Sequence, residues 1–356
     1  LRTLLHRKIT TTSMEYKIND KVYNISSNLT DFQIKLYTHL IDWKHKHITK
    51  EPGIYKGNLY DLMFPESYSK NNEISPVIYD KIHSEIKEIQ KSPFAYKVHK
   101  MAFHMASSQC ACINLFLPVL LDSKANEIIS KIPGCPCNFD KIDRSKLYKG
   151  FCFEYWGQDI TSGKGLLNDH SNVAGTDADI AIAYLNKKGE SCLWLIEHKL
   201  TETDFTNCGG YKSKNNKPKE SCKNSNLDDI LCNPELCRYH QIGYNYWSIQ
   251  QSKNYLFNAP INSKGCPFLN GVNQLWRNQL LAFALENTPK YTHVSFSVVH
   301  HKDNTSLQPT IDKYKQLITN NITFTTFTNS DIVNSAETYS NELSEWITWY
   351  KDLYNL

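Results

Sequence analysis

Charged residues lie near the start of one apolar segment and near the end of the next. The segment 176–185 carries Asp177 and Asp179 near its start, and the segment 191–200 closes with Glu197 and Lys199. In each pair the two residues are separated by one position, which is the spacing of side chains on one face of a strand. Carboxylates bind divalent cations, and an ammonium group stabilises charge growing on a phosphoryl group. The set therefore predicts metal-assisted hydrolysis of a phosphate ester.

The two segments must pair as a hairpin for these residues to meet. They are joined by Lys187-Lys188-Gly189, with glycine at the position that commonly turns left-handed in a three-residue loop. A hairpin symmetric about Lys188 places Asp179 opposite Glu197, with Cβ atoms about 4.5–5.5 Å apart. Opposed carboxylates repel each other, so this pairing indicates a divalent cation as compensation.

The same hairpin places Asp177 opposite Lys199, and all four charged residues then project from one face. Asp177 either joins the metal site or neutralises Lys199, and Asp179 is the better ligand because it faces Glu197. The opposite face is apolar and is expected to anchor the hairpin in the core through Ile180, Ile182, Tyr184, Trp194 and Ile196.

Further elements surround this hairpin. A charge-poor apolar stretch predicts a buried helix at 101–121, and an apolar stripe predicts a second helix at 271–286. Aromatic residues predict a strand at 150–156, and a further strand is expected at 293–300. The expected order is helix, strand, strand, strand, helix, strand, an α/β core at 101–300. We expect an N-terminal, mostly helical accessory region at 1–100, a polar insert at 201–265 and a C-terminal helical extension at 301–356.

Four stretches together resemble the PD-(D/E)xK nuclease superfamily, and within it the chain is similar to a family of bacterial proteins assigned as restriction endonucleases. The resemblance covers about 101–300. It rests on Gly175-Thr-Asp-Ala-Asp179, Ile196-Glu-His-Lys199-Leu-Thr-Glu202, Ser107-Ser-Gln109 with Asn114-Leu-Phe116, and Gln274-Leu-Trp-Arg277-Asn-Gln-Leu-Leu281.

The resemblance implies a restriction-endonuclease-like core, a mixed sheet flanked by helices in the order α-β-β-β-α-β. It implies that Asp179, Glu197 and the main-chain carbonyl of His198 hold Mg²⁺ or Mn²⁺, while Lys199 positions the attacking water. It also implies double-stranded DNA as the substrate, and a homodimer is an expectation of the same origin. The first helix of this superfamily often supplies a glutamate; here it offers Gln109, so Glu154 on the first strand is the candidate replacement.

Three polar residues outside the hairpin are candidates for supporting roles. Gln274 and Arg277 lie one helical turn apart, where Arg277 could contact a phosphate and Gln274 could orient the strand near the metal. The sequence is equally consistent with Gln274 and Arg277 forming a polar pair that faces solvent. Glu202 either belongs to the active site or caps the strand.

The chain has eleven cysteines. Cys208, Cys222, Cys232 and Cys237 in the insert could bind structural zinc, remain free, or hold an iron–sulfur cluster. Cys135 and Cys137 form a weaker metal candidate, whereas Cys110 and Cys112 are expected to pack in a buried helix. The lysines of the insert could follow a DNA backbone or be merely solvated: Lys212, Lys214, Lys217, Lys219 and Lys223. The histidines His104, His300 and His301 are expected at the edge of the core or on the surface.

Bulk composition sets broad limits. The 356 residues are 40% hydrophobic and 21% charged with a net charge of +4, typical of a globular protein with local rather than global affinity for phosphate. Without an apolar run long enough to cross a bilayer, a cytoplasmic location is expected. Residues 1–13 are either a leader or upstream read-through before Met14. The rival functions are a repair or recombination nuclease acting on ends or single strands, and a catalytically silent DNA-binding protein.

Overall fold

The computed structural model describes residues 13–18, 20–160, 163–171, 175–214, 219–252, 257, 265–319 and 323–356. Most of the expected leader, residues 1–12, and Lys217 lie outside these ranges. Ser13 and Met14 belong to the first strand, β1 (Ser13–Ile18). Within the described part of the chain, we find no helix with the length and apolar character needed to span a membrane.

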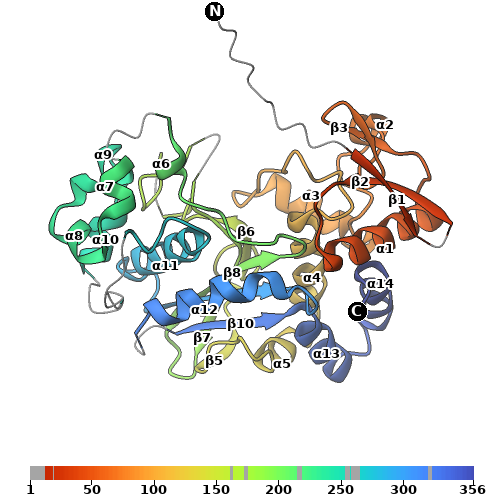
Figure 1. The fold of residues 1–356 in the computed structure, drawn as a ribbon. Helices are drawn as coiled ribbons and strands as arrows, with labels where there is room; N and C mark the ends of the chain where they lie inside the picture. The colour runs from red at the N-terminus through yellow and green to blue at the C-terminus, as the bar shows by residue number, and fades with distance from the viewer. Residues whose placement is uncertain are drawn as a thin grey trace, which may run out of the picture.

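A mixed six-stranded sheet forms the centre of the molecule (Figure 1). Its strands run in the order β10-β9-β8-β7-β5, and β6 also pairs with β7. The β7–β8 pair is antiparallel, whereas β8, β9 and β10 are parallel to one another. The bounds are β5 (Phe139–Ile142), β6 (Phe151–Tyr155), β7 (Ala178–Asn186), β8 (Ser191–Lys199), β9 (His293–His300) and β10 (Phe324–Thr328).

One face of the sheet is covered by helices from both ends of the chain. They are α1 (Asp31–His47), α4 (Ser108–Leu121), α5 (Ala125–Ser130), α13 (Asn329–Tyr339) and α14 (Ser344–Tyr354). The predicted apolar anchors of the hairpin, from Ile180 to Ile196, lie in this core. The helix expected from Met101 begins at Ser108, because the Met105 amide bonds back to the Leu62 carbonyl and the Ser107 hydroxyl caps the first turn.

The other face packs against α11 (Val272–Glu286) and α12 (Gln308–Leu317) in a second apolar cluster. Beyond α11 lie five short helices of the expected insert, which form a lobe at one side of Figure 1. Their bounds are α6 (Gly209–Lys212), α7 (Lys219–Asn224), α8 (Leu227–Cys232), α9 (Arg238–Gln241) and α10 (Tyr246–Ser252). Buried residues of this lobe, including Ile230 and Trp247, join the second cluster. The insert is thus packed against the core.

The N-terminal region differs from the mostly helical expectation because two β-hairpins accompany its helices. Buried Lys44 on α1 draws this region together by donating to the carbonyls of Glu51, Asp61 and Met63. The hairpins are β1 with β2 (Lys21–Ser26) and β3 (Gly53–Tyr55) with β4 (Asn58–Tyr60); the further helices are α2 (Glu66–Asn71) and α3 (His83–Lys91).

The segment beyond residue 300 is also less purely helical than expected. Its strand β10 extends the sheet beside β9, pairing Phe324 with Phe296. Single 3₁₀ turns occur at Asp80–Ile82, Pro234–Leu236 and Thr305–Leu307. The mixed α/β class is confirmed, and the predicted succession of elements is present as α4, β6, β7, β8, α11 and β9, with β5 and β10 added.

Candidate active site

The β7–β8 hairpin has the predicted register. Ile180 pairs with Ile196, which places Asp179 opposite Glu197. Gly189 in the connecting loop has a φ of 77°, the left-handed conformation that the sequence indicated. The main-chain amide of His198 donates to Asp179 Oδ2 at 2.6 Å. The two predicted acids therefore lie side by side at one end of the hairpin.

A third carboxylate extends this pair into a row. Strand β6 pairs Phe153 with Ile180 and Tyr155 with Ala178, so that Glu154 lies opposite Asp179. Glu154 has a φ of 50°, which is rare for a residue with a side chain and is often found at functional sites. We call Glu154, Asp179 and Glu197 the carboxylate row; it crosses three neighbouring strands.

Glu197 is fixed by donors on both of its oxygens. Gln274 donates to Oε1 at 2.6 Å, and Asn278 donates to Oε2 at 2.6 Å. Lys199 Nζ lies 2.8 Å from Oε1. Gln274 and Asn278 are four residues apart on α11, so one helix face supplies both amides. Glu197 is only 3% exposed and is held in a single orientation.

Glu154 is held from the opposite side by α4. Buried Gln109 donates to Glu154 Oε1 at 2.8 Å and accepts the His99 amide at 2.9 Å. The His99 ring lies 3.3 Å from Glu154 Oε2. Gln109 therefore contacts Glu154, the predicted replacement ligand, directly.

Negative charge is concentrated in and around the carboxylate row. Burial raises the pKa of Asp179 well above its usual range, and the nearby charges of Glu197 and Glu154 raise it further. Burial and the same two carboxylates raise the pKa of Asp177 to about 7. Burial alone would lower the pKa of Lys199, but Glu197 and the other nearby acids outweigh it and keep the ammonium charged. The arrangement favours an additional cation beside the acids.

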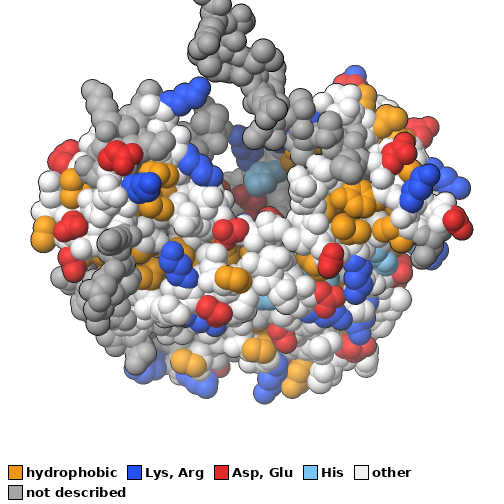
Figure 2. Space-filling view, viewed as in Figure 1, with side chains coloured by type: hydrophobic (Ala, Val, Ile, Leu, Met, Phe, Trp, Pro, Cys, Tyr) orange, Lys and Arg blue, Asp and Glu red, His pale blue; other side chains and the backbone are white. Residues whose placement is uncertain are grey.

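Figure 2 shows a hollow between the N-terminal region and the insert lobe, with acidic and histidine side chains visible in it. A cavity of about 1060 Å³ is lined by the segment 95–101, Glu154, Trp156 and Asp177. A second cavity of about 510 Å³ also reaches Asp177 and is lined by Gln274 and Arg277. A substrate can therefore approach Glu154, one member of the row, and neighbouring Asp177 from solvent.

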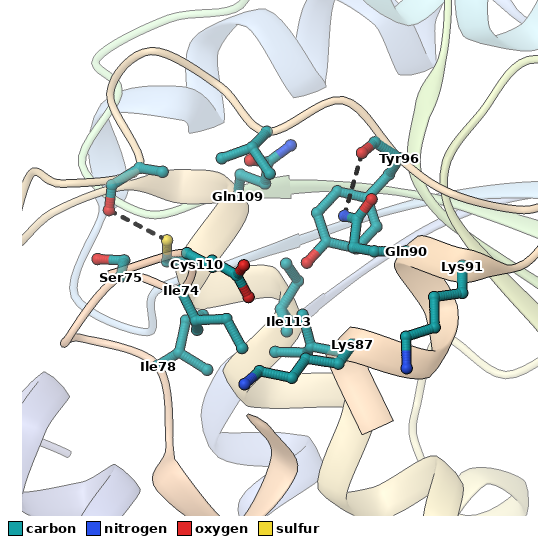
Figure 3. Close-up of a pocket in the computed structure, with 14 residues that line it drawn as sticks. Ile74, Ser75, Ile78, Lys87, Gln90, Lys91, Tyr96, Gln109, Cys110 and Ile113 are labelled. Carbon is teal, nitrogen blue, oxygen red and sulfur yellow. Dashed lines mark hydrogen bonds between the residues drawn. The ribbon is translucent and has the colours of Figure 1, made fainter. Parts of the chain in front are cut away.

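A third, mainly apolar cavity of about 330 Å³ lies behind Gln109, between α3 and α4 (Figure 3). Tyr96 lines both this cavity and the large one, and its carbonyl accepts a hydrogen bond from Gln90 at 3.1 Å. The carboxylate row does not line it, so it is not part of the candidate active site.

Gln274 and Arg277 are not a surface pair. Besides the bond from Gln274 to Glu197, Arg277 donates to Asn273 Oδ1 at 3.1 Å and to Thr176 Oγ1 at 3.0 Å. Arg277 is half-buried and lines the second cavity. These bonds fix its guanidinium beside the approach to the site.

Several other candidate residues are buried or make contacts that stabilise the fold. Glu202 accepts the amides of Leu200 and Thr201, at 2.8 and 3.0 Å, and so caps the end of β8. Burial would raise the pKa of Glu202, yet nearby Lys199 lowers it overall. His104 and His301 are buried, whereas His300 is half-buried. Cys110 and Cys112 are buried on α4, as expected.

The insert cysteines do not all come together. Cys208, Cys222 and Cys237 are buried, whereas Cys232 is exposed. Cys266, outside the expected set, lies within electrostatic reach of the three buried ones. Cys135 is half-buried and Cys137 exposed. Among the described residues, no three His, Cys, Asp or Glu side chains are arranged as a ready-made metal site.

Two contacts of the site were missed at the level of sequence. Asn278 follows Gln274 by four residues, so helix periodicity could have revealed it once Gln274 was a candidate. His99 comes from an irregular segment, and no sequence pattern connects it to Glu154. Both act on the carboxylate row through hydrogen bonds or close contacts.

The fold and the site together define an α/β protein with a row of carboxylates and one lysine at the end of a central hairpin. Residues 38–355 match the model of a family described as restriction endonuclease associating with ARP, and the chain belongs to this family. The expected restriction-endonuclease relationship is confirmed, and the match extends well beyond the 101–300 core. No curated protein and no solved structure matched the chain.

Proposed function

We propose that the chain is a metal-dependent endonuclease that hydrolyses phosphodiester bonds of DNA in a restriction or defence setting. The observation that carries the proposal is the carboxylate row, with Lys199 charged beside Glu197. Family membership supports a nuclease of the restriction type. The PD-(D/E)xK assignment, the metal and the cleaved bond are parts of the proposal.

The residues present fit Mg²⁺ or Mn²⁺. Asp179 and Glu197 would hold the ion together with the main-chain carbonyl of His198, which also accepts a bond from the Ser108 hydroxyl. Mg²⁺ usually takes one or two protein carboxylates and keeps several waters, so a group of three side chains is not required. When bound, the ion would supply an activated water and neutralise charge on the phosphate.

The side chains around the ion would have the remaining roles. Lys199 is the buried cation nearest to Glu197, and its raised pKa suits it to orient a water or to stabilise phosphate oxygens rather than to accept a proton. Gln274 and Asn278 keep Glu197 from rotating. Gln109 and His99 orient Glu154, which would act as an additional acid facing the substrate. Arg277 would contact a phosphate at the edge of the cleft.

The test is cleavage of unmethylated closed-circular plasmid by the wild-type protein and by Lys199→Ala, each with Mg²⁺ or with EDTA. We expect discrete Mg²⁺-dependent fragments from the wild type and none from Lys199→Ala, which should still bind DNA. The exposed Lys131→Ala is the matched control and should cleave normally. Retained cleavage by Lys199→Ala would contradict the assignment. Degradation of DNA only from free ends would support a repair nuclease. DNA binding without cleavage would support a catalytically silent DNA-binding protein.

A further inference from the structure

Four cysteines from separate parts of the insert gather where its lobe meets α11. Cys208 precedes α6, Cys222 lies in α7, Cys237 precedes α9, and Cys266 lies before α11. The first three are at most 5% exposed. Cys266 packs against the same apolar cluster as Cys208 and Cys237. Three buried sulfurs and one half-buried sulfur, far apart in the sequence, thus lie in the same part of the lobe.

Backbone contacts bring Cys222 and Cys266 together. Gly265 packs so closely on the Lys223 carbonyl that an added Cβ would lie 2.1 Å from that oxygen. Gly265 also has a φ of 87°, so both the space and the conformation require glycine. The close approach joins the residues immediately next to the two cysteines.

A second set of contacts brings Cys208 to the other two segments. Its amide donates to the Leu269 carbonyl at 3.0 Å, which connects it to the segment after Cys266. The amide of Gly209 donates to the Tyr239 hydroxyl at 2.9 Å, which connects it to the segment after Cys237. Cys208 and the adjacent Gly209 are therefore joined by hydrogen bonds to the two other segments.

Main-chain amides point at three of the sulfurs. Each donor lies two or three residues beyond the cysteine that it contacts, a local arrangement that stabilises a sulfur carrying negative charge. The donors are Tyr211 to Cys208 at 3.3 Å, Tyr239 and His240 to Cys237, and Phe268 to Cys266. Burial raises the pKa of Cys237 and of Cys266, so these thiols would lose their protons only as an ion binds.

The helices of the surrounding lobe are too short to be stable on their own. Its helices α6 to α10 have four, six, six, four and seven residues. Helices shorter than about 12 residues are marginal in isolation. A metal ion bound by side chains from several such segments would supply the missing connection, because its binding free energy becomes folding free energy.

We propose that Cys208, Cys222, Cys237 and Cys266 bind one structural Zn²⁺, with Cys232 excluded. The sulfurs are not at ligand spacing in the described structure. Binding of the ion would require the four side chains to turn toward a common point. Four thiolates around Zn²⁺ form a closed tetrahedral site without an open position for catalysis. The site would therefore stabilise the lobe that forms one side of the substrate cleft.

The test is metal analysis of the full-length protein, purified without chelators, by mass spectrometry of the elements. We expect about one zinc per chain in the wild type, as for a single four-thiolate site. The Cys266→Ser variant should lose this zinc, and Cys232→Ser, the matched control, should retain it. Zinc lost from Cys232→Ser but retained in Cys266→Ser would overturn the proposed set of ligands.

A second measurement keeps the test valid if Cys266→Ser does not fold. Wild-type protein is treated with a thiol-modifying mercurial, and released zinc is followed with a chromogenic chelator. Stoichiometric release confirms thiolate ligation, whereas folded wild-type protein without zinc overturns the proposal. Iron with sulfide in place of zinc would overturn the identity of the ion. The readout is zinc content, so it is independent of whether the chain cleaves DNA.

Discussion

Glu197 receives hydrogen bonds or ionic contacts from Gln274, Asn278 and Lys199, and these contacts leave it little freedom to reorient. Such supporting contacts matter because a ligand or catalytic carboxylate must keep its geometry to within a fraction of an ångström. Asn278 has no other assigned task at the site. Its replacement therefore isolates the contribution of positioning from that of charge.

We predict that Asn278→Ala lowers the rate of plasmid cleavage by about 10- to 100-fold, the range typical of residues that orient metal ligands. Affinity for DNA should change little, because buried Asn278 bonds to Glu197. Initial rates at saturating DNA, together with a filter-binding titration, measure the two effects. The exposed Asn334→Ala on α13 is the matched control. An unchanged cleavage rate in a folded Asn278→Ala protein would show that Glu197 needs no such support.

Buried His104 makes stability depend on pH. Its Nδ1 accepts the Ala106 amide at 3.0 Å, and its ring packs near Tyr37 and Tyr60. Burial first, and nearby Lys44 second, lower its pKa from 6.5 to about 4. Between these values the unfolded chain binds a proton that the folded protein does not, so stability falls as the pH falls from 6.5 to about 4.

We predict that this residue contributes about 3 kcal/mol to the loss of stability across that window, from the size of the pKa shift. Urea unfolding at several pH values between 7 and 4 measures the loss in the wild type. His104→Gln, which cannot bind the proton, should show a correspondingly shallower fall. An equal fall in both proteins would mean that His104 is not responsible.

At the scale of elements, the β7–β8 hairpin decides which side chains reach the site. A register shift of one residue would turn Glu197 and Lys199 to the other face of the sheet. The three-residue loop with Gly189 fixes the register, and nothing lies within 4 Å of an added Cβ there. A substitution at Gly189 therefore tests backbone conformation without a steric clash.

We predict that Gly189→Ala destabilises the protein by about 1–2 kcal/mol, the cost of a left-handed conformation for a residue with a Cβ. Gly189→Asn should cost less, because asparagine tolerates this conformation better. Chemical denaturation of the three proteins gives the comparison. Equal stability of Gly189→Ala and wild type would contradict the left-handed loop and weaken the argument for the register.

The hairpin could be predicted from sequence because its signals are local: a turn glycine, alternation and two apolar segments. The start of α4 could not, because an apolar composition indicates burial but not whether residues 101–107 form turns. Strand β10 was missed for a different reason, since Phe324–Thr328 forms a strand only by pairing with β9. Cys266 was missed because its closeness to Cys222 depends on the contact of Gly265 with Lys223.

At the scale of the molecule, the candidate site needs parts that are distant in sequence. The sheet supplies the carboxylate row, α4 supplies Gln109, α11 supplies Gln274 and Asn278, and the N-terminal region and the insert lobe border the cleft. Sequence identified the acids and the lysine because their spacing is that of a strand. Of the residues that orient them, Gln109 and Gln274 were candidates from sequence, whereas Asn278 and His99 became visible only with the tertiary structure.

The measurement that tests the central claim most directly is Mn²⁺ binding, followed by the loss of the electron paramagnetic resonance signal of the free ion. The wild type should take up Mn²⁺ that Mg²⁺ displaces, and Asp179→Asn should bind it at least about 10-fold more weakly, as expected on loss of one of two carboxylate ligands. Asp140→Asn, exposed on β5, should bind like the wild type. Equal binding by Asp179→Asn and wild type would contradict the assignment of the carboxylate row as the metal site.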